Sequence, residues 1–528
     1  MTSSSLIRGR PRRAASHISV RVAHALLGGA AGVGWLLLPV TTISTDVPVA
    51  ISADAPVAAA ESQDEETSAT DLALPLVVLA AAGTLAGYAY IRRIRRARTR
   101  TTPGGAPATP AVPPLTDLDE QSRTLLTEAD NWIRTSREEL AFAEARSGAE
   151  AVAPFARALH DAQTELSAAF RIRRRYDAGI PADQPSRRHA LTGIVGRCQE
   201  AGSRLDAQAP AFDQLRALER EDGEAVRIAE TRFRELTGRT PVTEATATDL
   251  TQRYAPSASA PVTGYVEEAK NRLVLATTHL NHSRQATDSG DTGRAVHALR
   301  AAESAVAQAD VFLTAVDRLA EDLRTAAGLV PAALTGAETE LAVVREVLAG
   351  APRQPAAAPP NLPEGELRAR LRHADIVLTA VRNTLTGGQR DDPLDLLRRI
   401  AEAVAPVAAG RTGVLPAAAL LTARSAIADA DGFVETHRAV VGAEARTLLA
   451  AAREALEAGH TRSDTAAEGP VPTPATLTTR LHAGTSARRA RELAEQDVRL
   501  HGNPSLDPAP ANSFGGPRTA ARRNPPPG

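Results

Sequence analysis

Cysteine, lysine and aromatic residues are scarce in this 528-residue sequence. The single cysteine, Cys198, excludes an intrachain disulfide and any CxxC metal or redox motif. The single lysine, Lys270, is followed by Asn271, so no P-loop Gly-Lys-Ser/Thr is present. Aromatics make up 3% of the chain, although 43% of its residues are apolar. The apolar content is therefore mainly Ala, Leu and Val, which suits closely packed helices better than β-sandwiches or aromatic-lined ligand pockets.

Sequence motifs for catalysis are also missing. There is no HExxH, no GxSxG, and no GxGxxG placed after a strand. His279 and His282 are three residues apart and precede Asp288 and Asp291, but a metal site would need further ligands from elsewhere, and surface histidines are the favoured interpretation. We therefore predict a non-enzymatic protein with no catalytic residue, no cofactor, no metal ligand and no small-molecule substrate.

The charge of the chain is unevenly distributed. The formal net charge is −1, but residues 1–100 hold 11 Arg and 7 Asp/Glu, and the tail from 501 holds 3 Arg and 1 Asp. These segments carry +4 and +2, so residues 101–500 carry −7. A mildly acidic body argues against nucleic-acid binding, which needs clustered cations.

Two uncharged segments near the N-terminus predict membrane spans. They run from Ala25 to Thr45 and from Leu72 to Ile91. Twenty helical residues cover about 30 Å, which matches the hydrocarbon core of a bilayer. The intervening loop, 46–71, holds seven acidic residues and no basic one, whereas arginines flank both outer ends. The positive-inside rule then predicts a hairpin in a bacterial inner (cytoplasmic) membrane, with both termini and the bulk of the chain on the cytoplasmic side.

A second interpretation of the first segment stays open. A basic start, an apolar stretch with Pro39, and the small residues of 58–60 also fit a signal peptide, which would leave a single span. Six arginines follow the second segment as a stop-transfer flank that can also contact anionic lipid head groups: Arg92, Arg93, Arg95, Arg96, Arg98 and Arg100.

Helical periodicity dominates the rest of the chain. Apolar residues alternate at spacings of three and four over 152–169 and again over 299–320, and no period-two alternation competes. Breakers at 179–185, 238–241, 254–261, 350–363, 387–388, 410–416 and 469–474 divide this body into antiparallel helix pairs. Residues 278–310 and 377–407 share a plan of helix, turn and helix. We predict an all-α fold of coiled-coil or antiparallel helical-hairpin bundles.

The predicted organisation has eight segments. They are a basic N-terminus (1–24), a first span or signal peptide (25–45), an acidic outer loop (46–71), a transmembrane helix (72–91), an Arg-rich flank and Pro/Gly linker (92–115), two helical regions (116–350 and 364–500), and a disordered tail (501–528).

One basic run within the body, 171–176 (RIRRRY), allows two interpretations. It could bind an acidic or phosphorylated partner. The favoured alternative is that its arginines lie at a helix C-terminus, where they interact favourably with the helix dipole.

Several extended stretches carry a family resemblance. They include SREELAFAEARSGAEAVAPFARALHDAQTELSAAFRIRR, GRCQEAGSRLDAQAPAFDQLRALER, RYAPSASAPV, AVHALRAAESAVAQADVFLTAVDRLAEDL, DPLDLLRRIAEAV and RARELAEQDV. Together with the second span, they resemble the cytoplasmic coiled-coil part of bacterial membrane proteins that carry an extracytoplasmic TPM domain. The resemblance covers about 72–500. In that family a signal peptide, an α/β TPM domain and a span precede the helical part, and the TPM domain is associated with metal binding and proposed phosphatase activity.

This chain departs from the family pattern in two places. Only 26 residues, 46–71, stand where the TPM domain would be, too few to fold into such a domain, so that domain is predicted to be missing. The Gly-rich tail of the family is reduced to Phe514-Gly515-Gly516.

These observations favour a membrane-tethered cytoplasmic helical adaptor or scaffold. Its expected partners are membrane lipid and a protein bound through helices, either another protein or a second copy of itself. Two alternatives remain open: a degenerate TPM protein with a metal-dependent or phosphatase-related role, and an envelope-stress signalling subunit that senses through the acidic loop.

Overall fold

The structure is a computed structural model that describes residues 113–218, 223–350, 362–464, 474–502 and 513–523. Across these ranges the chain is all-helical and no strand occurs, which confirms the predicted all-α class. The predicted spans (Ala25 to Thr45 and Leu72 to Ile91), the acidic loop and the arginines of 92–100 lie outside the described residues.

Thirteen α-helices and two 3-10 turns make up the described part. They are α3 (Leu115–Ser147), α4 (Ala149–Asp177), α5 (Gln184–Arg216), α6 (Glu224–Arg253), α7 (Pro256–Ser259), η1 (Ala260–Val262), α8 (Tyr265–Asp288), α9 (Thr292–Leu348), α10 (Glu364–Thr386), α11 (Pro393–Val404), η3 (Ala405–Val407), α12 (Val414–Thr436), α13 (Ala443–Asp464), α14 (Pro474–His501) and α15 (Pro517–Arg523).

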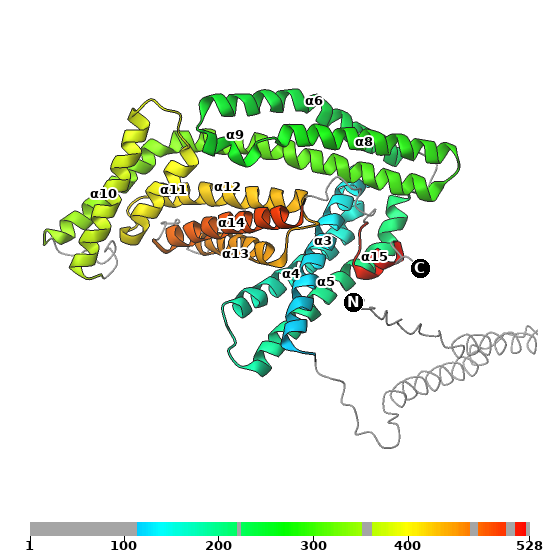
Figure 1. Ribbon diagram of the computed structural model, residues 1–528, viewed down its shortest axis with the longest axis horizontal. Helices are drawn as coiled ribbons and strands as arrows, with labels where there is room; N and C mark the ends of the chain where they lie inside the picture. The colour runs from blue at the N-terminus through cyan, green and yellow to red at the C-terminus, as the bar shows by residue number, and fades with distance from the viewer. Residues whose placement is uncertain (1–112, 219–222, 351–361, 465–473, 503–512, 524–528) are drawn as a thin grey trace, which may run out of the picture. The chain divides into compact units, whose positions relative to one another are not determined.

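Three groups of helices pack around α9 (Figure 1). Helices α3, α4 and α5 form the first group, and α6 and α8 lie along the N-terminal half of α9 as the second. The third group contains α10 to α14, of which α10, α11 and α12 contact α9 directly. The two helical regions expected from sequence, 116–350 and 364–500, therefore belong to one compact unit.

The apolar alternation read from the sequence marks the buried faces. Every residue of the first alternating series, within 152–169, is buried on α4. Every residue of the second series, within 299–320, is buried on α9. These residues are Val152, Phe155, Leu159, Ala162, Leu166 and Ala169, then Leu299, Ala302, Val306, Ala309, Leu313, Val316 and Ala320. The alanines among these residues let neighbouring helices approach closely, so the core needs few aromatic side chains.

Aspartate side chains cap three of the helices after turns. Asp183 accepts a hydrogen bond from the backbone N–H of Ser186 at 2.9 Å, and Asp291 accepts one from Arg294 at 3.0 Å. Asp392 caps α11 in the same way. Such caps satisfy amides that have no partner inside the helix. The turns before α9 and α11 confirm the helix–turn–helix plan of 278–310 and 377–407.

One predicted break is wrong. Residues 238–241 do not interrupt a helix, because α6 continues through Pro241. A proline inside a helix costs about 3 kcal/mol. Contacts with α9 on both sides of the proline offset this cost: Leu236 and Leu250 are buried, and Arg239 pairs with Asp317 at 2.7 Å.

The expected disordered tail is replaced in part by a docked segment. Within 501–528, residues 513–523 have a defined place on α5, where they end in helix α15 (Figure 1). Phe514 is fully buried among aromatic side chains of α4 and α5. Composition alone missed this contact, because one phenylalanine in a polar tail carries little apolar signal.

Helix α9 has enough length and apolar content to cross a membrane, alone among helices in the described ranges. It contacts α6, α8, α10, α11 and α12, and its buried side chains extend from Ala295 to Val344. A core helix surrounded by others passes the same test of composition. We therefore interpret α9 as the core helix of this bundle.

Candidate functional site

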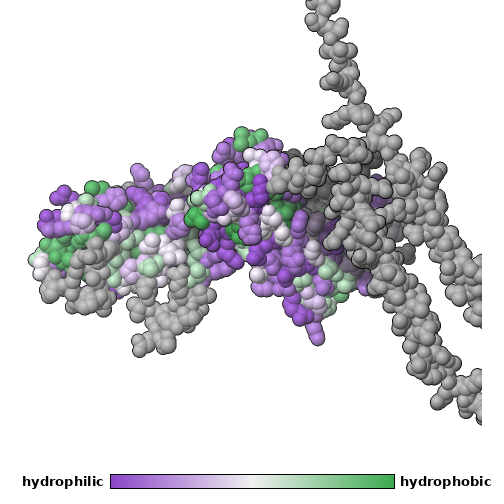
Figure 2. All heavy atoms as spheres, turned by 90° about the horizontal axis from the view of Figure 1, so that it is seen from below, coloured by the Kyte–Doolittle hydropathy of each residue, from purple (hydrophilic) through white to green (hydrophobic). Residues whose placement is uncertain are grey.

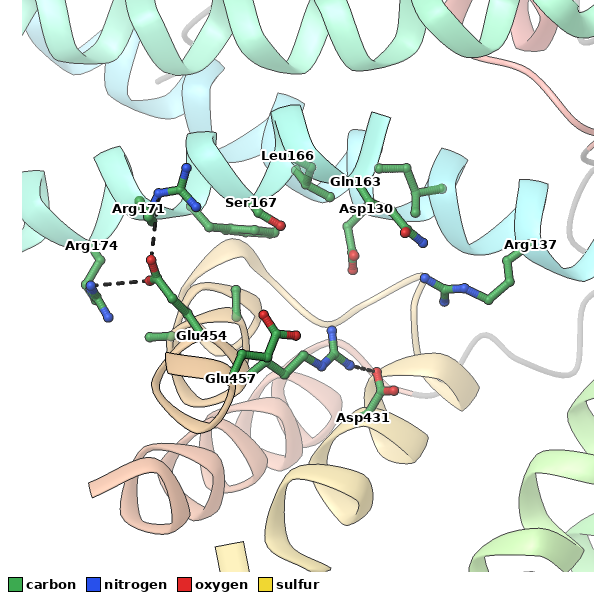
Figure 3. Close-up of a pocket in the computed structure, with 15 residues that line it drawn as sticks. Asp130, Arg137, Gln163, Leu166, Ser167, Arg171, Arg174, Asp431, Glu454 and Glu457 are labelled. Carbon is green, nitrogen blue, oxygen red and sulfur yellow. Dashed lines mark ion pairs between the residues drawn. The ribbon is translucent and has the colours of Figure 1, made fainter. Parts of the chain in front are cut away.

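A charged groove lies between the α3–α4 pair and helices α12 and α13 (Figure 3). Its volume is about 560 Å³. It is lined by Asp130, Ile133, Arg137, Gln163, Leu166, Ser167, Phe170, Arg171, Arg174, Asp431, Ala450, Ala451, Arg453, Glu454 and Glu457. The groove therefore joins segments that are about 300 residues apart in the chain.

The groove combines an apolar floor with a charged rim. Ile133, Leu166 and Phe170 belong to the buried core of the first helical group and form the apolar part. Arg137 on α3 and Glu457 on α13 point into the open space from opposite sides (Figure 3). A surface that combines apolar residues with charges of both signs can accept the side of an amphipathic helix.

The arginines of the basic run 171–176 make two kinds of contact, one across the groove and one in the interior. Arg171 and Arg174 reach across the groove to Glu454 of α13, at 3.7 and 3.4 Å. Arg173 is buried instead, where it contacts Asp119 and Asp177 and lies over the ring of Tyr176. Helix α4 ends at Asp177, which confirms the predicted helix C-terminus. The exposed arginines also give the groove its basic end.

A buried arginine beneath the groove ties α3 to α12. Arg134 is only 3% exposed, and its guanidinium contacts three carboxylates. Its Nε lies 2.9 Å from Asp130 Oδ2, its Nη2 2.9 Å from Asp431 Oδ1, and its Nη1 2.5 Å from Glu435 Oε2. A guanidinium with its donors used in this way holds the two helices at a fixed separation.

Two further arginines extend this network into the α12–α13 connection. Arg446 contacts Asp130 and donates from Nε to the carbonyl of Val441 at 3.0 Å. Arg438 binds both carboxylate oxygens of Glu138, at 2.7 and 3.2 Å. The turn between α12 and α13 is thereby fastened to α3.

The charges of this network are fixed by their surroundings. Burial raises the pKa of Asp130, but Arg134 and Arg446 outweigh it and hold that pKa well below its usual value. The pKa of Asp431 is lowered in the same way by Arg134 and Arg453. Glu138 behaves differently, because its burial raises the pKa to about 7 despite the opposing effect of Arg438. Asp130 and Asp431, which line the groove beside its apolar floor, are therefore ionised at neutral pH.

The histidine pair and the cysteine noted in the sequence lie on α8 and α5. Within the described ranges, no group of three or more His, Cys, Asp or Glu side chains is arranged to hold a metal ion. The rings of His279 and His282 lie 6.3 Å apart, and the pKa of His279 is lowered by burial and by His282 and His297. Cys198 is fully buried on α5, and burial raises the pKa of its thiol to about 12. This disfavours a reactive thiol.

Sequence reasoning did not find the buried charge network. Arg134 and Glu435 are 301 positions apart, and no local pattern marks them as partners. The nearest signal is that Arg134 directly follows Ile133, one of the buried residues of α3. An arginine so close to a buried apolar position is a candidate for a buried ion pair.

The fold and the groove define an all-helical bundle protein with a mixed-charge interhelical surface. Two proteins of Mycobacterium tuberculosis are similar to this chain: UPF0603 protein MT2410 of strain CDC 1551 and UPF0603 protein Rv2345 of strain H37Rv. Each is 33% identical over 416 residues, which are 76% of this chain and 60% of the relative. The chain thus spans about three fifths of the length of these relatives. No family model and no solved structure matches it.

Proposed function

We propose that this chain is a non-enzymatic, membrane-tethered helical adaptor on the cytoplasmic side of a bacterial inner membrane. Residues 72–91, together with 25–45 where that segment is retained, form the tether. The helical body that follows the tether carries the binding surface. As part of this proposal, the chain is a TPM-family protein that keeps the span and the helical part and lacks the TPM domain.

The charged groove carries this proposal. It is open to solvent, its floor is apolar, and its walls come from α3, α4, α12 and α13. Arg134 and Arg446 hold those walls together from beneath, so the shape exists before a partner arrives. A preformed surface loses less conformational entropy on binding than one that must order itself. We propose an amphipathic helix of a partner protein as the occupant.

The visible surface is mixed in polarity rather than uniformly apolar. On the face shown in Figure 2, hydrophilic residues are mixed with small hydrophobic patches across the coloured part of the chain. Small scattered patches are normal on soluble surfaces and bind few partners by themselves.

Crosslinked purification from native membranes tests the proposal. The full chain, an Arg137→Glu variant and an Arg294→Glu control are compared. Both arginines are exposed, but only Arg137 lines the groove. We expect a defined co-purifying protein with the wild type and the control, reduced at least about tenfold by Arg137→Glu because a charge in the interface is reversed. Equal recovery from all three would contradict the role of the groove.

A further inference from the structure

A second groove, on α3, α4 and α5, is already occupied by the C-terminal segment of the chain itself. Phe514 is 0% exposed, stacks on Phe212 with ring centroids 4.5 Å apart, and meets Phe155 edge to face at 5.9 Å. Phe155 and Phe212 also contact each other. The three rings form one cluster in which Phe514 is the removable member, because the other two belong to long helices.

Asp206 on α5 binds the backbone of the same segment. Its carboxylate accepts hydrogen bonds from the N–H groups of Gly516, Arg518 and Thr519 at 2.9 to 3.0 Å. It also accepts one from the Thr519 hydroxyl at 2.6 Å. A single carboxylate that receives four hydrogen bonds from one short segment is a recognition element rather than an incidental contact.

Two glycines of the segment fit where no other residue would. Gly515 has a φ of 146°, which favours glycine, and its N–H donates to Ser136 Oγ at 3.2 Å. Gly516 lies against the backbone of Gly202, so a side chain at 516 would clash with the Gly202 carbonyl group. A side chain at 202 would in turn clash with Pro517. The groove therefore fits the sequence Phe-Gly-Gly-Pro position by position.

We propose that this groove is a peptide-binding site for Phe-Gly-Gly-Pro, and that the C-terminal segment of a second copy of the chain occupies it in exchange for the cis segment. The segment is joined to α14 through the ten residues 503–512, and the contacts described above lie on α3, α4 and α5. Nothing in those contacts depends on the segment and the groove belonging to one chain. Exchange of identical segments is a low-cost route to self-association, and tethering of copies in one membrane would raise their effective concentration.

This groove is separate from the charged groove of the adaptor proposal, so each proposal can fail without the other. The test uses the full chain in detergent micelles and a fluorescent peptide of residues 513–523. The Phe514→Ala chain, which has a weakened cis segment and an intact groove, should bind the peptide and not a peptide carrying Gly516→Val. A second chain, Gly516→Val, frees the groove without removing a core side chain, in case Phe514→Ala impairs folding. Circular dichroism checks both.

The decisive comparison mixes two full-length variants with different tags. Phe514→Ala chains lack the ligand, and Asp206→Ala chains lack the main polar contact of the groove. We expect a mixed complex in which the Asp206→Ala tail fills the Phe514→Ala groove, with at least about tenfold less self-association of either variant alone. Folded variants that neither bind the peptide nor form the mixed complex would overturn the proposal and leave a purely internal contact.

Discussion

Glu303 shows how burial and charge compete at a single side chain. It is 2% exposed on α9, and its Oε2 contacts Arg216 of α5. Its Oε1 has no hydrogen-bond partner among the described residues. Burial raises its pKa to about 7; Arg216 opposes this rise and Glu139 adds to it. Burial thus makes the ionised form costlier inside the fold than it is in water.

This pKa gives a pH-dependent prediction for Glu303→Gln. The folded pKa lies above the unfolded value of about 4.3, so the folded chain binds more protons than the unfolded chain between these values. The contribution of Glu303 to stability is therefore full at low pH and is lost as the pH rises through 7. Glu303→Gln mimics the protonated form. We expect it to be more stable than the wild type at pH 8, by on the order of a few kcal/mol, with little difference at pH 4, below the unfolded pKa.

Urea unfolding at the two pH values checks this expectation. Glu321→Gln, which removes an exposed carboxylate from the same helix, controls for the change in net charge. A Glu303→Gln variant that is less stable than the wild type at pH 8 would show that the ionised side chain is favourable where it lies.

Arg134 tests the buried network directly. Arg134→Ala would remove the cation that Asp130, Asp431 and Glu435 share, so that three acidic side chains would keep fewer positive partners. We expect a loss of about 3 kcal/mol or more in the free energy of unfolding, because uncompensated buried charges are costly. Arg123→Ala, whose side chain is 58% exposed in its pair with Asp119, should change it by less than about 1 kcal/mol. Equal effects of the two variants would refute a special role for the network.

At the scale of elements, helix faces were predictable and long-range partners were not. The buried faces of α4 and α9 follow from the spacing of apolar residues, since a helix turns 100° per residue whatever its neighbours are. The continuation of α6 through Pro241 could not be predicted, because the cost of a proline is local, whereas the contacts that offset it come from α9. The docking of Phe514 could not be predicted either, because a single apolar residue carries too little signal in a polar tail.

Glu340 illustrates an element held by one side chain. It is almost fully buried on α9, and it accepts hydrogen bonds from the backbone N–H groups of residues 409–412, before α12. Sequence could not reveal this contact, which joins positions about 70 residues apart. The connection between η3 and α12 therefore depends on a carboxylate from a neighbouring helix.

Removal of this carboxylate should loosen the connection. We expect Glu340→Ala to lower the free energy of unfolding by about 3 kcal/mol, because buried amides would lose their acceptor. Hydrogen exchange should also become faster at residues 409–412. Glu338→Ala, which removes an exposed pair with Arg382, should leave that exchange unchanged. Unaltered exchange in Glu340→Ala would contradict the assignment.

At the scale of the whole molecule, α9 joins the two helical regions, and the buried arginines fasten the first group to α12 and α13. The sequence predicted the two regions as separate because the Pro-rich stretch near 350–363 looks like a boundary. In the fold, α9 and α10 on either side of that stretch contact each other. The Pro-rich stretch therefore does not separate two independently packed groups of helices.

The adaptor proposal requires that a partner lies in the charged groove while the chain is at the membrane. A photo-crosslinking amino acid placed at position 137, or at 294 as control, in the full chain in native membranes measures this directly. We expect a discrete crosslinked protein from position 137 and none from 294. The peptide of that protein that carries the crosslink should form an amphipathic helix. The same products from both positions, or a loop peptide crosslinked at 137, would contradict it.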